Sequence, residues 1–393
     1  AQMKAILAGA LETGLGTVYS NATVFVENGR ITGVTEGLDP KNADEVIDAS
    51  EMIVTPGFID AHTHIGTYCE GFPEGMADAN DMVNPVAPHL RILDAVYQDD
   101  TAFADALAGG VTCVQTLPGS GNIIGGQGAV IKTSTSIQGR KKTVDEMIVR
   151  APSCMKAALG ENPIRVYKEK QKLPNTRMGN AALLRQALVE ASNYRNKTIH
   201  ARSKNEPAER NLQQEALLPV LDGDLSLCIH AHRCDDIATA VRIAEEFSVP
   251  FTVEHCTEGH LIAPFLAEKN VYAAVGPTLT GKPKIELRNK TWDTPALLWK
   301  AGVHFCIITD HPVVPIEHLS VCLSLAVRAG LPREEAIKAV TIYAAEHLGI
   351  ADRTGSIETG KDADIVIWDG DPLDARSRVV RTIIDGETVF SRT

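Results

Sequence analysis

Two histidines separated by one residue, His62 and His64, are the first residues whose type and spacing can do chemistry. They close residues 58–64, an apolar run that predicts a buried strand. Side chains two positions apart on a strand point to the same face, so both imidazoles can reach one metal ion. The pair alone is a weak signal, because a buried histidine is commonly a hydrogen-bonded core residue.

Residues of matching chemistry close three further β-rich runs: His230 with His232, then His255, then Asp310. Imidazole and carboxylate groups are ligands that zinc, iron and manganese accept. Singly, each has a plainer interpretation, such as a core histidine or a helix-capping aspartate. Together they predict a metal site. We expect His230 to be a ligand, because it emerges first from its apolar run, and His232 to contact the substrate or support the ligands.

Lys156 lies in another candidate strand and has two interpretations. An ammonium group cannot ligate a metal. An N-carboxylated lysine, however, offers two anionic oxygens that can bridge two ions about 3.5–4 Å apart. The alternative is a lysine that pairs with the substrate or with a carboxylate. Glu161, a few residues further on, is an alternative oxygen ligand.

The elements that must position these residues alternate short β-rich runs with helical stretches, the pattern of a parallel α/β domain. Apolar residues at i, i+3 and i+4 spacing predict helices over 180–196, 237–247 and 333–348. Eight candidate strands fit a (β/α)8 barrel, whose active site lies at the carboxyl ends of its strands. The candidate strands are residues 58–64, 111–117, 128–133, 154–159, 225–231, 250–256, 271–275 and 304–309.

Both ends of the chain are β-rich. An Asn28-Gly29 turn separates the runs 17–27 and 30–35, and an Asp385-Gly386 turn lies within residues 379–390. Both dipeptides are typical of β-hairpins. We therefore expect one small β-domain built from the two ends of the chain.

Composition limits the partners. The net charge of −12 argues against nucleic acid, because phosphate binding requires a basic face. No run reaches the roughly 18–20 apolar residues of a membrane span. The eight cysteines are scattered without a CxxC pair, as expected for buried thiols in a reducing compartment. With no secretory signal pattern at the start of the sequence, we expect a cytoplasmic protein that acts on a small molecule as a homo-oligomer.

Two separate segments resemble the amidohydrolase superfamily, and the resemblance covers nearly the whole chain. They are Pro56-Gly57-Phe58-Ile59-Asp60-Ala61-His62-Thr63-His64 and Gly355-Ser356-Ile357-Glu358-Thr359-Gly360-Lys361-Asp362-Ala363-Asp364-Ile365-Val366. The chain looks most like the imidazolonepropionase-related group, which includes peptidases acting on small acyl or dipeptide substrates. It differs from imidazolonepropionase itself at His230-Ala231-His232-Arg233, where an acidic residue is expected shortly after the histidine.

The resemblance implies a barrel over residues 55–351 and a composite β-sandwich domain over 1–54 and 352–393. It also implies one or two divalent metal ions; zinc is expected first, with iron or manganese as alternatives. For two ions, the matching positions assign His62, His64 and Asp310 to one and His230 and His255 to the other. N-carboxylated Lys156 would bridge them. For one ion, His255 becomes free to act in catalysis.

The expected activity is hydrolysis of a C–N bond in an amide or cyclic amide. Metal-bound hydroxide attacks, Asp310 acts as general acid and base, and His232 or His255 stabilises the oxyanion. The alternatives are deamination of a ring amidine and a non-catalytic scaffold, which should lack several ligands. Residues near the predicted strand ends are candidate substrate contacts: Tyr68, Glu70, His89, Gln127, Arg233, His260 and His311.

Overall fold

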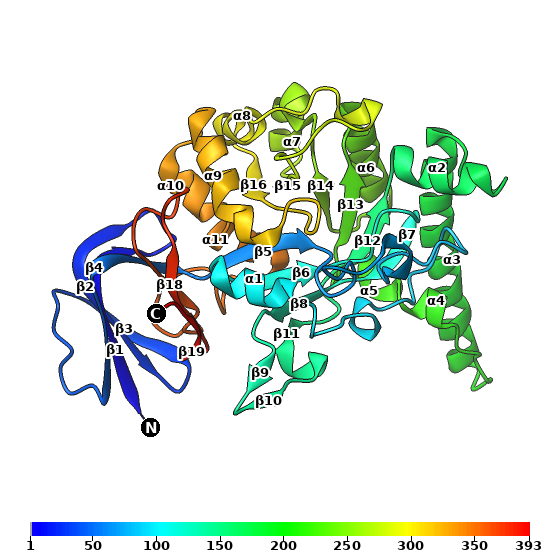
Figure 1. Ribbon diagram of the computed structural model, residues 1–393. Coiled ribbons are helices and arrows are strands. Elements are labelled where there is room, and N and C mark those ends of the chain that lie inside the picture. The colour runs from blue at the N-terminus through cyan, green and yellow to red at the C-terminus, as the bar shows by residue number, and fades with distance from the viewer. Residues whose placement is uncertain (1) are drawn as a thin grey trace.

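The computed structural model describes residues 2–393 and brings strands from both ends of the chain into one seven-stranded sheet (Figure 1). The strand order is β19-β18-β17-β4-β1-β2-β3, and β1 and β4 are its one parallel pair. The predicted hairpin turns at Asn28-Gly29 and Asp385-Gly386 are confirmed. The strands are β1 (Met3–Glu12), β2 (Val18–Glu27), β3 (Arg30–Glu36), β4 (Glu45–Pro56), β17 (Ile365–Trp368), β18 (Val379–Ile384) and β19 (Glu387–Ser391).

The middle of the chain forms two larger sheets, with orders β11-β8-β6-β5 and β16-β15-β14-β13-β12-β7. A parallel bridge between Thr63 and His311 links β5 to the segment after β16. At the other edges, the chain passes from β7 into β8 through Gly128. The strands are β5 (Phe58–Thr63), β6 (Val111–Thr116), β7 (Ile124–Gln127), β8 (Ala129–Lys132), β11 (Ile148–Arg150), β12 (Met155–Ala158), β13 (Leu227–Ala231), β14 (Phe251–His255), β15 (Tyr272–Val275) and β16 (His304–Ile307); β9 (Ser136–Ile137) and β10 (Arg140–Lys141) form a separate hairpin.

The third predicted strand, residues 128–133, does not run parallel to its neighbours as a regular (β/α)8 barrel requires. β8 pairs antiparallel with β6, and β7 pairs antiparallel with β12. A parallel return needs a crossover of a dozen or more residues, usually helical. Residues 117–123 between β6 and β7 are too few for such a crossover and contain no helix. The chain therefore turns back along the neighbouring strand.

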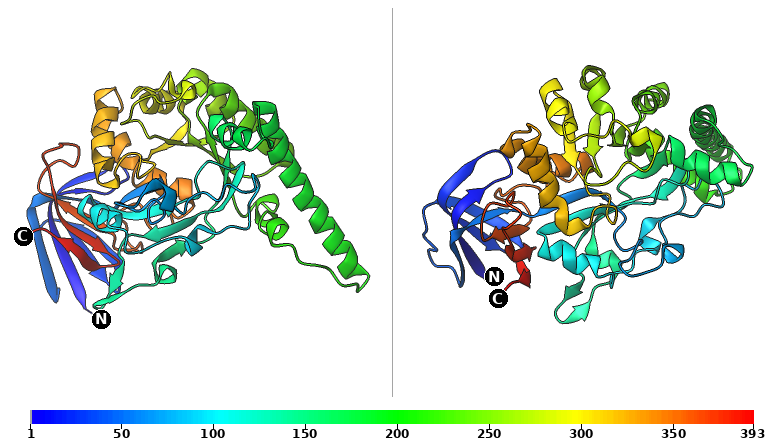
Figure 2. Two further views of the ribbon diagram at one scale, coloured as in Figure 1. Left: turned by 45° about the vertical axis from the view of Figure 1, so that its right-hand side comes forward. Right: turned by 45° about the horizontal axis from the view of Figure 1, so that its top comes forward.

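Helices cover the outside of these sheets, and α3 extends well beyond them (Figure 2). The predicted helix 333–348 is in fact two helices. Its break has a physical cause: the carbonyls of Ala339 and Val340 accept hydrogen bonds from Ile307 N and Ile59 N on neighbouring strands. The helices are α1 (Ala102–Ala108), α2 (Glu161–Glu169), α3 (Arg177–Ser203), α4 (Leu212–Glu215), α5 (Leu218–Leu221), α6 (Cys234–Phe247), α7 (Ala263–Glu268), α8 (Thr294–Ala301), α9 (Leu319–Arg328), α10 (Arg333–Lys338) and α11 (Ile342–Leu348), with 3-10 turns at Glu74–Met76, Ile92–Asp94, Val144–Met147, Gly259–Ile262, Ile285–Leu287 and Ile316–His318.

Gly57 joins the seven-stranded sheet to the strand that carries His62. A Cβ atom at Gly57 would lie 2.0 Å from Thr112 Oγ1, so no larger residue fits between β4 and β5. The next residue, Phe58, packs its ring 5.3 Å from that of Trp368 on β17. The Pro-Gly-Phe motif thus has a structural reason, because it fixes where β5 begins and hence where its histidines lie.

Within residues 2–393, no helix is long and apolar enough to cross a membrane. All eight cysteines are free, and six of them are buried, which agrees with the expectation of buried thiols.

A buried ion cluster joins β8 to the seven-stranded sheet. Lys132 Nζ lies 2.7 Å from Asp362 and 3.2 Å from Asp364, and it also contacts Asp385. Burial alone would lower the pKa of Lys132, but the surrounding carboxylates outweigh it and raise the pKa. The lysine therefore stays charged and neutralises two buried acids, Asp362 and Asp364, whereas Asp385 is half exposed.

Substitution of Lys132 should be costly, because it leaves the buried Asp364 without a counter-charge, whereas Asp362 keeps its pair with Arg353. We expect Lys132→Met to lower the free energy of unfolding by about 3–5 kcal/mol. The matched control is Lys141→Met, which breaks the exposed pair with Asp99 and should cost far less, because water screens that pair. Urea unfolding followed by circular dichroism measures both. Equal losses in the two variants would contradict the structural role of the cluster.

Candidate metal centre

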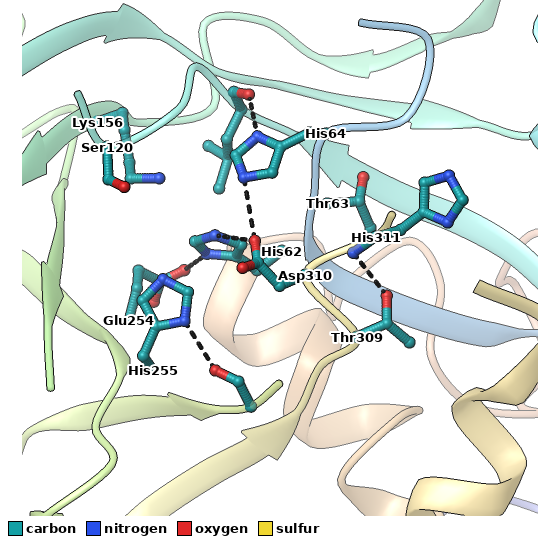
Figure 3. A network of polar contacts seen from close by, with 12 residues as sticks. His62, Thr63, His64, Ser120, Lys156, Glu254, His255, Thr309, Asp310 and His311 are labelled. Atoms are coloured by element: carbon teal, nitrogen blue, oxygen red, sulfur yellow. Dashed lines mark hydrogen bonds and ion pairs between the residues drawn. The ribbon is translucent and has the colours of Figure 1, made fainter. Parts of the chain in front are cut away.

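The first cluster of candidate ligands comprises His62, His64 and Asp310 (Figure 3). His62 lies in β5, His64 directly follows that strand, and Asp310 follows β16. Asp310 Oδ1 lies 3.2 Å from His62 Nε2 and 3.0 Å from His64 Nε2. Two backbone hydrogen bonds hold the segments together, from Asp310 N to His62 O (3.1 Å) and from His64 N to His311 O (2.8 Å). The three side chains thus converge at the carboxyl ends of their strands.

The second cluster comprises His230, His232 and His255, whose ring centroids lie 4.4–4.7 Å apart. His230 lies in β13, His232 follows it, and His255 ends β14. The ring of His255 also lies 4.7 Å from that of His62, so the two clusters adjoin. His232 is as much a part of the cluster as His230, although we expected His230 to be the ligand.

Backbone carbonyls fix the tautomers of two of these histidines. His64 Nδ1 lies 2.7 Å from Leu117 O, and His255 Nδ1 lies 2.7 Å from Gly276 O. A carbonyl can only accept, so each Nδ1 carries the proton and each Nε2 keeps a free lone pair. Gly276 is itself required, because at φ +145° its Cβ would lie 2.2 Å from Ile308 O. Both imidazoles are therefore prepared to ligate a metal through Nε2.

The chemistry of this donor set fits a divalent metal ion. Several buried atoms here lack a hydrogen-bond partner within residues 2–393: both ring nitrogens of His230, His62 Nε2 and Asp310 Oδ1. His62 Nε2 and Asp310 Oδ1 lie at the distance of an ion pair, but their contact lacks the geometry of a hydrogen bond. Each unsatisfied buried polar group costs about 1–3 kcal/mol. Imidazoles with one carboxylate are ligands suited to zinc, iron or manganese.

Burial keeps most of these histidines neutral. Loss of hydration lowers the pKa of His230 and of His232 well below the ordinary value. It also lowers the pKa of His255 to about 3, although the charge of Asp310 opposes the shift. In His62, burial acts in the same direction, but the adjoining carboxylates of Asp310 and Glu254 outweigh it and raise the pKa. A neutral imidazole is the form that binds metal, so the pocket favours ligation over protonation.

Asp310 remains ionised despite its burial. Burial would raise its pKa, but the imidazoles of His62 and His64 beside it outweigh that effect and hold the pKa well below the usual range. Its backbone adopts φ +53°, and that of His255 adopts φ +75°. Such a conformation costs a non-glycine residue about 1–3 kcal/mol. Strained residues of this kind are found mainly at functional sites.

Glu254 supports His62 and was given no role from sequence. Its Oε1 lies 3.0 Å from His62 Nδ1, and its Oε2 lies 2.9 Å from His347 Nε2 on α11. Burial would raise the pKa of Glu254, but His347 and His62 outweigh it and lower the pKa. A sequence signal existed, since a charged residue inside an apolar strand must find a partner. No local pattern could have identified His347 as that partner.

Lys156 lies near the first cluster and His255, with its ammonium directed toward them (Figure 3). The residue is 1% exposed, and its Nζ donates to Pro118 O at 3.1 Å. Besides burial, its charge acts to lower the pKa of His62 and of His255. No ion pair joins Lys156 to a carboxylate anywhere in residues 2–393. The predicted alternative ligand, Glu161, accepts instead from Glu286 N.

A cavity of about 1100 Å³ opens over both clusters. Its lining includes one predicted substrate contact, Tyr68, together with three residues not singled out from sequence, Asn162, Arg165 and Lys284. The remaining candidates lie outside the lining: Glu70, His89, Gln127, Arg233, His260 and His311.

Four of these outlying candidates are held by neighbours. The partners are Pro88 O for Gln127 (3.1 Å), Asp235 for Arg233 (2.6 Å), Thr294 Oγ1 for His260 (2.9 Å) and Ile316 N for His311 (3.0 Å). His89 lines a separate, smaller cavity, and Glu70 lies 3.9 Å from His311. Figure 3 shows the ring of His311 turned away from Asp310.

The amidohydrolase family profile matches residues 53–389, and the chain belongs to this family. An amidohydrolase from Thermotoga maritima MSB8, known from a crystal structure, is 41% identical, with a TM-score of 0.95 over 99% of this chain and 100% of that one. The imidazolonepropionase of Thermoplasma volcanium is 25% identical over 100% of this chain and 99% of its own length. The amidohydrolase tasK of Hapsidospora irregularis is 29% identical over 96% of this chain, which spans 41% of tasK.

These similarities confirm the predicted relation to the imidazolonepropionase-related amidohydrolases. The chain is a hydrolase that acts on carbon–nitrogen bonds other than ordinary peptide bonds. The histidine and aspartate clusters are the candidate sites for the divalent metal that this family generally uses.

Replacement of Glu254 should weaken metal binding, because the carboxylate orients His62 and increases its basicity. We expect Glu254→Gln to lower zinc affinity by about 10- to 100-fold in a chelator competition titration. Glu258→Gln is the matched control, because Glu258 is also buried but bonds Cys234 N and Asn289 instead of a clustered histidine. Equal zinc affinity in the two variants would show that Glu254 has no part in holding the metal.

Proposed function

We propose that this chain uses one or two divalent metal ions, zinc first, to hydrolyse an amide or cyclic amide bond of a small molecule. The observation that carries the proposal is the convergence of two buried donor clusters beneath one cavity. Their histidines are mostly held neutral by burial, whereas the single carboxylate among them stays ionised. Neutral imidazoles can ligate a metal, and an ionised carboxylate can accept a proton, so one site can do both.

In this proposal His62, His64 and Asp310 hold one ion, and His230 and His255 hold the other, with His232 as a further donor. When bound, a divalent ion lowers the pKa of water toward about 7 and polarises a carbonyl group. Asp310 accepts a proton from the attacking water and returns it to the leaving nitrogen. His232, held by Thr257 Oγ1 at 2.7 Å, is placed to hydrogen-bond the substrate oxygen if it is not itself a ligand.

We propose that Lys156 bridges the two ions as an N-carboxylated side chain. A neutral lysine amine adds carbon dioxide and loses a proton to give this anion. The proposal is supported by the burial of Lys156 and by its single carbonyl partner, because a buried ammonium beside metal ions would be repelled. The competing interpretation, pairing with a protein carboxylate, has no support among the ion pairs of residues 2–393.

Lys156→Ala should therefore change metal content. We expect two metal ions per chain in protein purified with zinc and bicarbonate, and one or none in the variant. Elemental analysis gives the stoichiometry, and ¹³C NMR after labelling with ¹³C-bicarbonate reports the carbamate carbon. One ion in both proteins, with no carbamate signal in either, would reject the bridge and favour the single-metal arrangement in which His255 is free for catalysis.

We further propose that the two central sheets close into a barrel over residues 55–351. The bridge between Thr63 and His311 supports closure at one edge, and the continuous β7–β8 segment supports it at the other. Residues 1–54 and 352–393 would then form the composite β-sandwich domain, to which all strands of the seven-stranded sheet belong apart from the last two residues of β4.

The activity is tested with a panel of hydantoins, N-acyl amino acids, dipeptides and cyclic amidines. We expect metal-dependent cleavage of an amide or cyclic amide without release of free ammonia. Ammonia release from an amidine would indicate the deaminase instead. Asp310→Asn should lower kcat by about 10²- to 10⁴-fold, because proton transfer is lost. Full activity of chelated, metal-free protein would contradict the proposed chemistry.

A further inference from the structure

The lining of the cavity contains three cations. Arg165 comes from α2, and Lys282 and Lys284 come from the segment between β15 and α8. Outside the two donor clusters, the lining contains one acid, Glu74. A cavity with such an excess of positive charge concentrates small anions. Arg233, the cation expected from sequence to meet the substrate, lies outside this lining.

Lys284 is fixed in place with one donor to spare. Its Nζ donates to Asn162 Oδ1 and to Glu286 Oε1, both at 2.9 Å, and Asn162 is held in turn by Ser120 Oγ at 2.8 Å. An ammonium group has three donors, so one remains for a ligand in the cavity. Besides burial and His255, the charge of Lys284 acts to lower the pKa of His232, so the ammonium lies within electrostatic reach of the second cluster.

Arg165 is the second cation with free donors. It lies one helical turn after Asn162 on α2, so both side chains reach the same cavity. The guanidinium makes no hydrogen bond or ion pair within residues 2–393, and its fork matches a carboxylate. Lys282 differs, because its ammonium already donates to Arg288 O at 3.1 Å.

We infer that the substrate carries a carboxylate, which Lys284 and Arg165 bind while the scissile amide lies at the donor clusters. This inference rests on the proposed function and names its substrate class: an N-acyl amino acid or a cyclic amide bearing a carboxylate. Lys284, fixed by Asn162 and Glu286, sets the position of the anion. Arg165, less constrained, adds affinity at the rim.

The test compares N-acetyl amino acids with the same compounds as C-terminal carboxamides, using zinc-loaded full-length protein. Saturation-transfer NMR and calorimetric titration measure binding, and a fluorogenic amine assay measures turnover. We expect the carboxylates to be favoured at least about tenfold, the effect of one charge-assisted hydrogen bond. Lys284→Met should remove most of this preference, and Lys284→Arg should retain a larger part of it. Arg165→Gln should raise Kd or KM several-fold with little change in kcat.

Lys168→Gln is the matched control, because Lys168 is an exposed cation of the same helix that does not line the cavity. It should behave as the unaltered protein does. If Lys284→Met does not fold because Glu286 has lost its cationic partner, Arg165→Gln still tests the subsite. Arg165 is exposed and forms no pair within residues 2–393. Carboxylate binding that depends on Lys284 and Arg165 but without turnover would support this subsite and reject the hydrolase. Turnover of carboxamides and carboxylates alike, unchanged in both variants, would overturn the subsite and leave the hydrolase standing.

Discussion

The structure depends on keeping five imidazoles and one carboxylate out of water at a single place. Removal from water disfavours a charged imidazole, so His230, His232 and His255 are neutral and have lone pairs to offer. Fixed acceptors such as Leu117 O and Gly276 O then decide which nitrogen carries the proton. A cluster of this kind leaves polar atoms unsatisfied unless a cation joins them, which is the physical basis of the proposed metal site.

The surrounding fold can be understood as the frame that holds these donors. Because Gly57 has no side chain, the chain between β4 and β5 can pass close to Thr112. This contact fixes where β5 begins and therefore where His62 and His64 lie. Asp60 accepts from Thr309 N at 3.3 Å and also from its hydroxyl, which ties β5 to the end of β16 just before Asp310. Burial raises the pKa of Asp60 to about 7. Such contacts determine the geometry without reaching the cavity themselves.

The sequence predicted those features that local chemistry determines. Buried apolar runs with polar ends located the strands that carry His62, His230, His255 and Asp310, because strand burial and side-chain alternation are properties of short segments. The direction of the third strand was wrong, since it depends on whether a crossover helix fits between β6 and β7. The prediction of one continuous helix over residues 333–348 was wrong for a related reason. The carbonyls of Ala339 and Val340 at its centre accept hydrogen bonds from neighbouring strands. Glu254 and Lys284 gain significance from partners distant in sequence, His347 and Asn162. Arg165 gains it from a cavity whose lining comes from distant segments.

The proposed function requires a cation at the two donor clusters. The most direct measurement is anomalous X-ray diffraction at the zinc edge from crystals of the chain grown with zinc. We expect an anomalous peak bounded by His62, His64 and Asp310, and a second bounded by His230 and His255 if Lys156 is carboxylated. Crystals with zinc in the solvent and no anomalous peak at either cluster would contradict it.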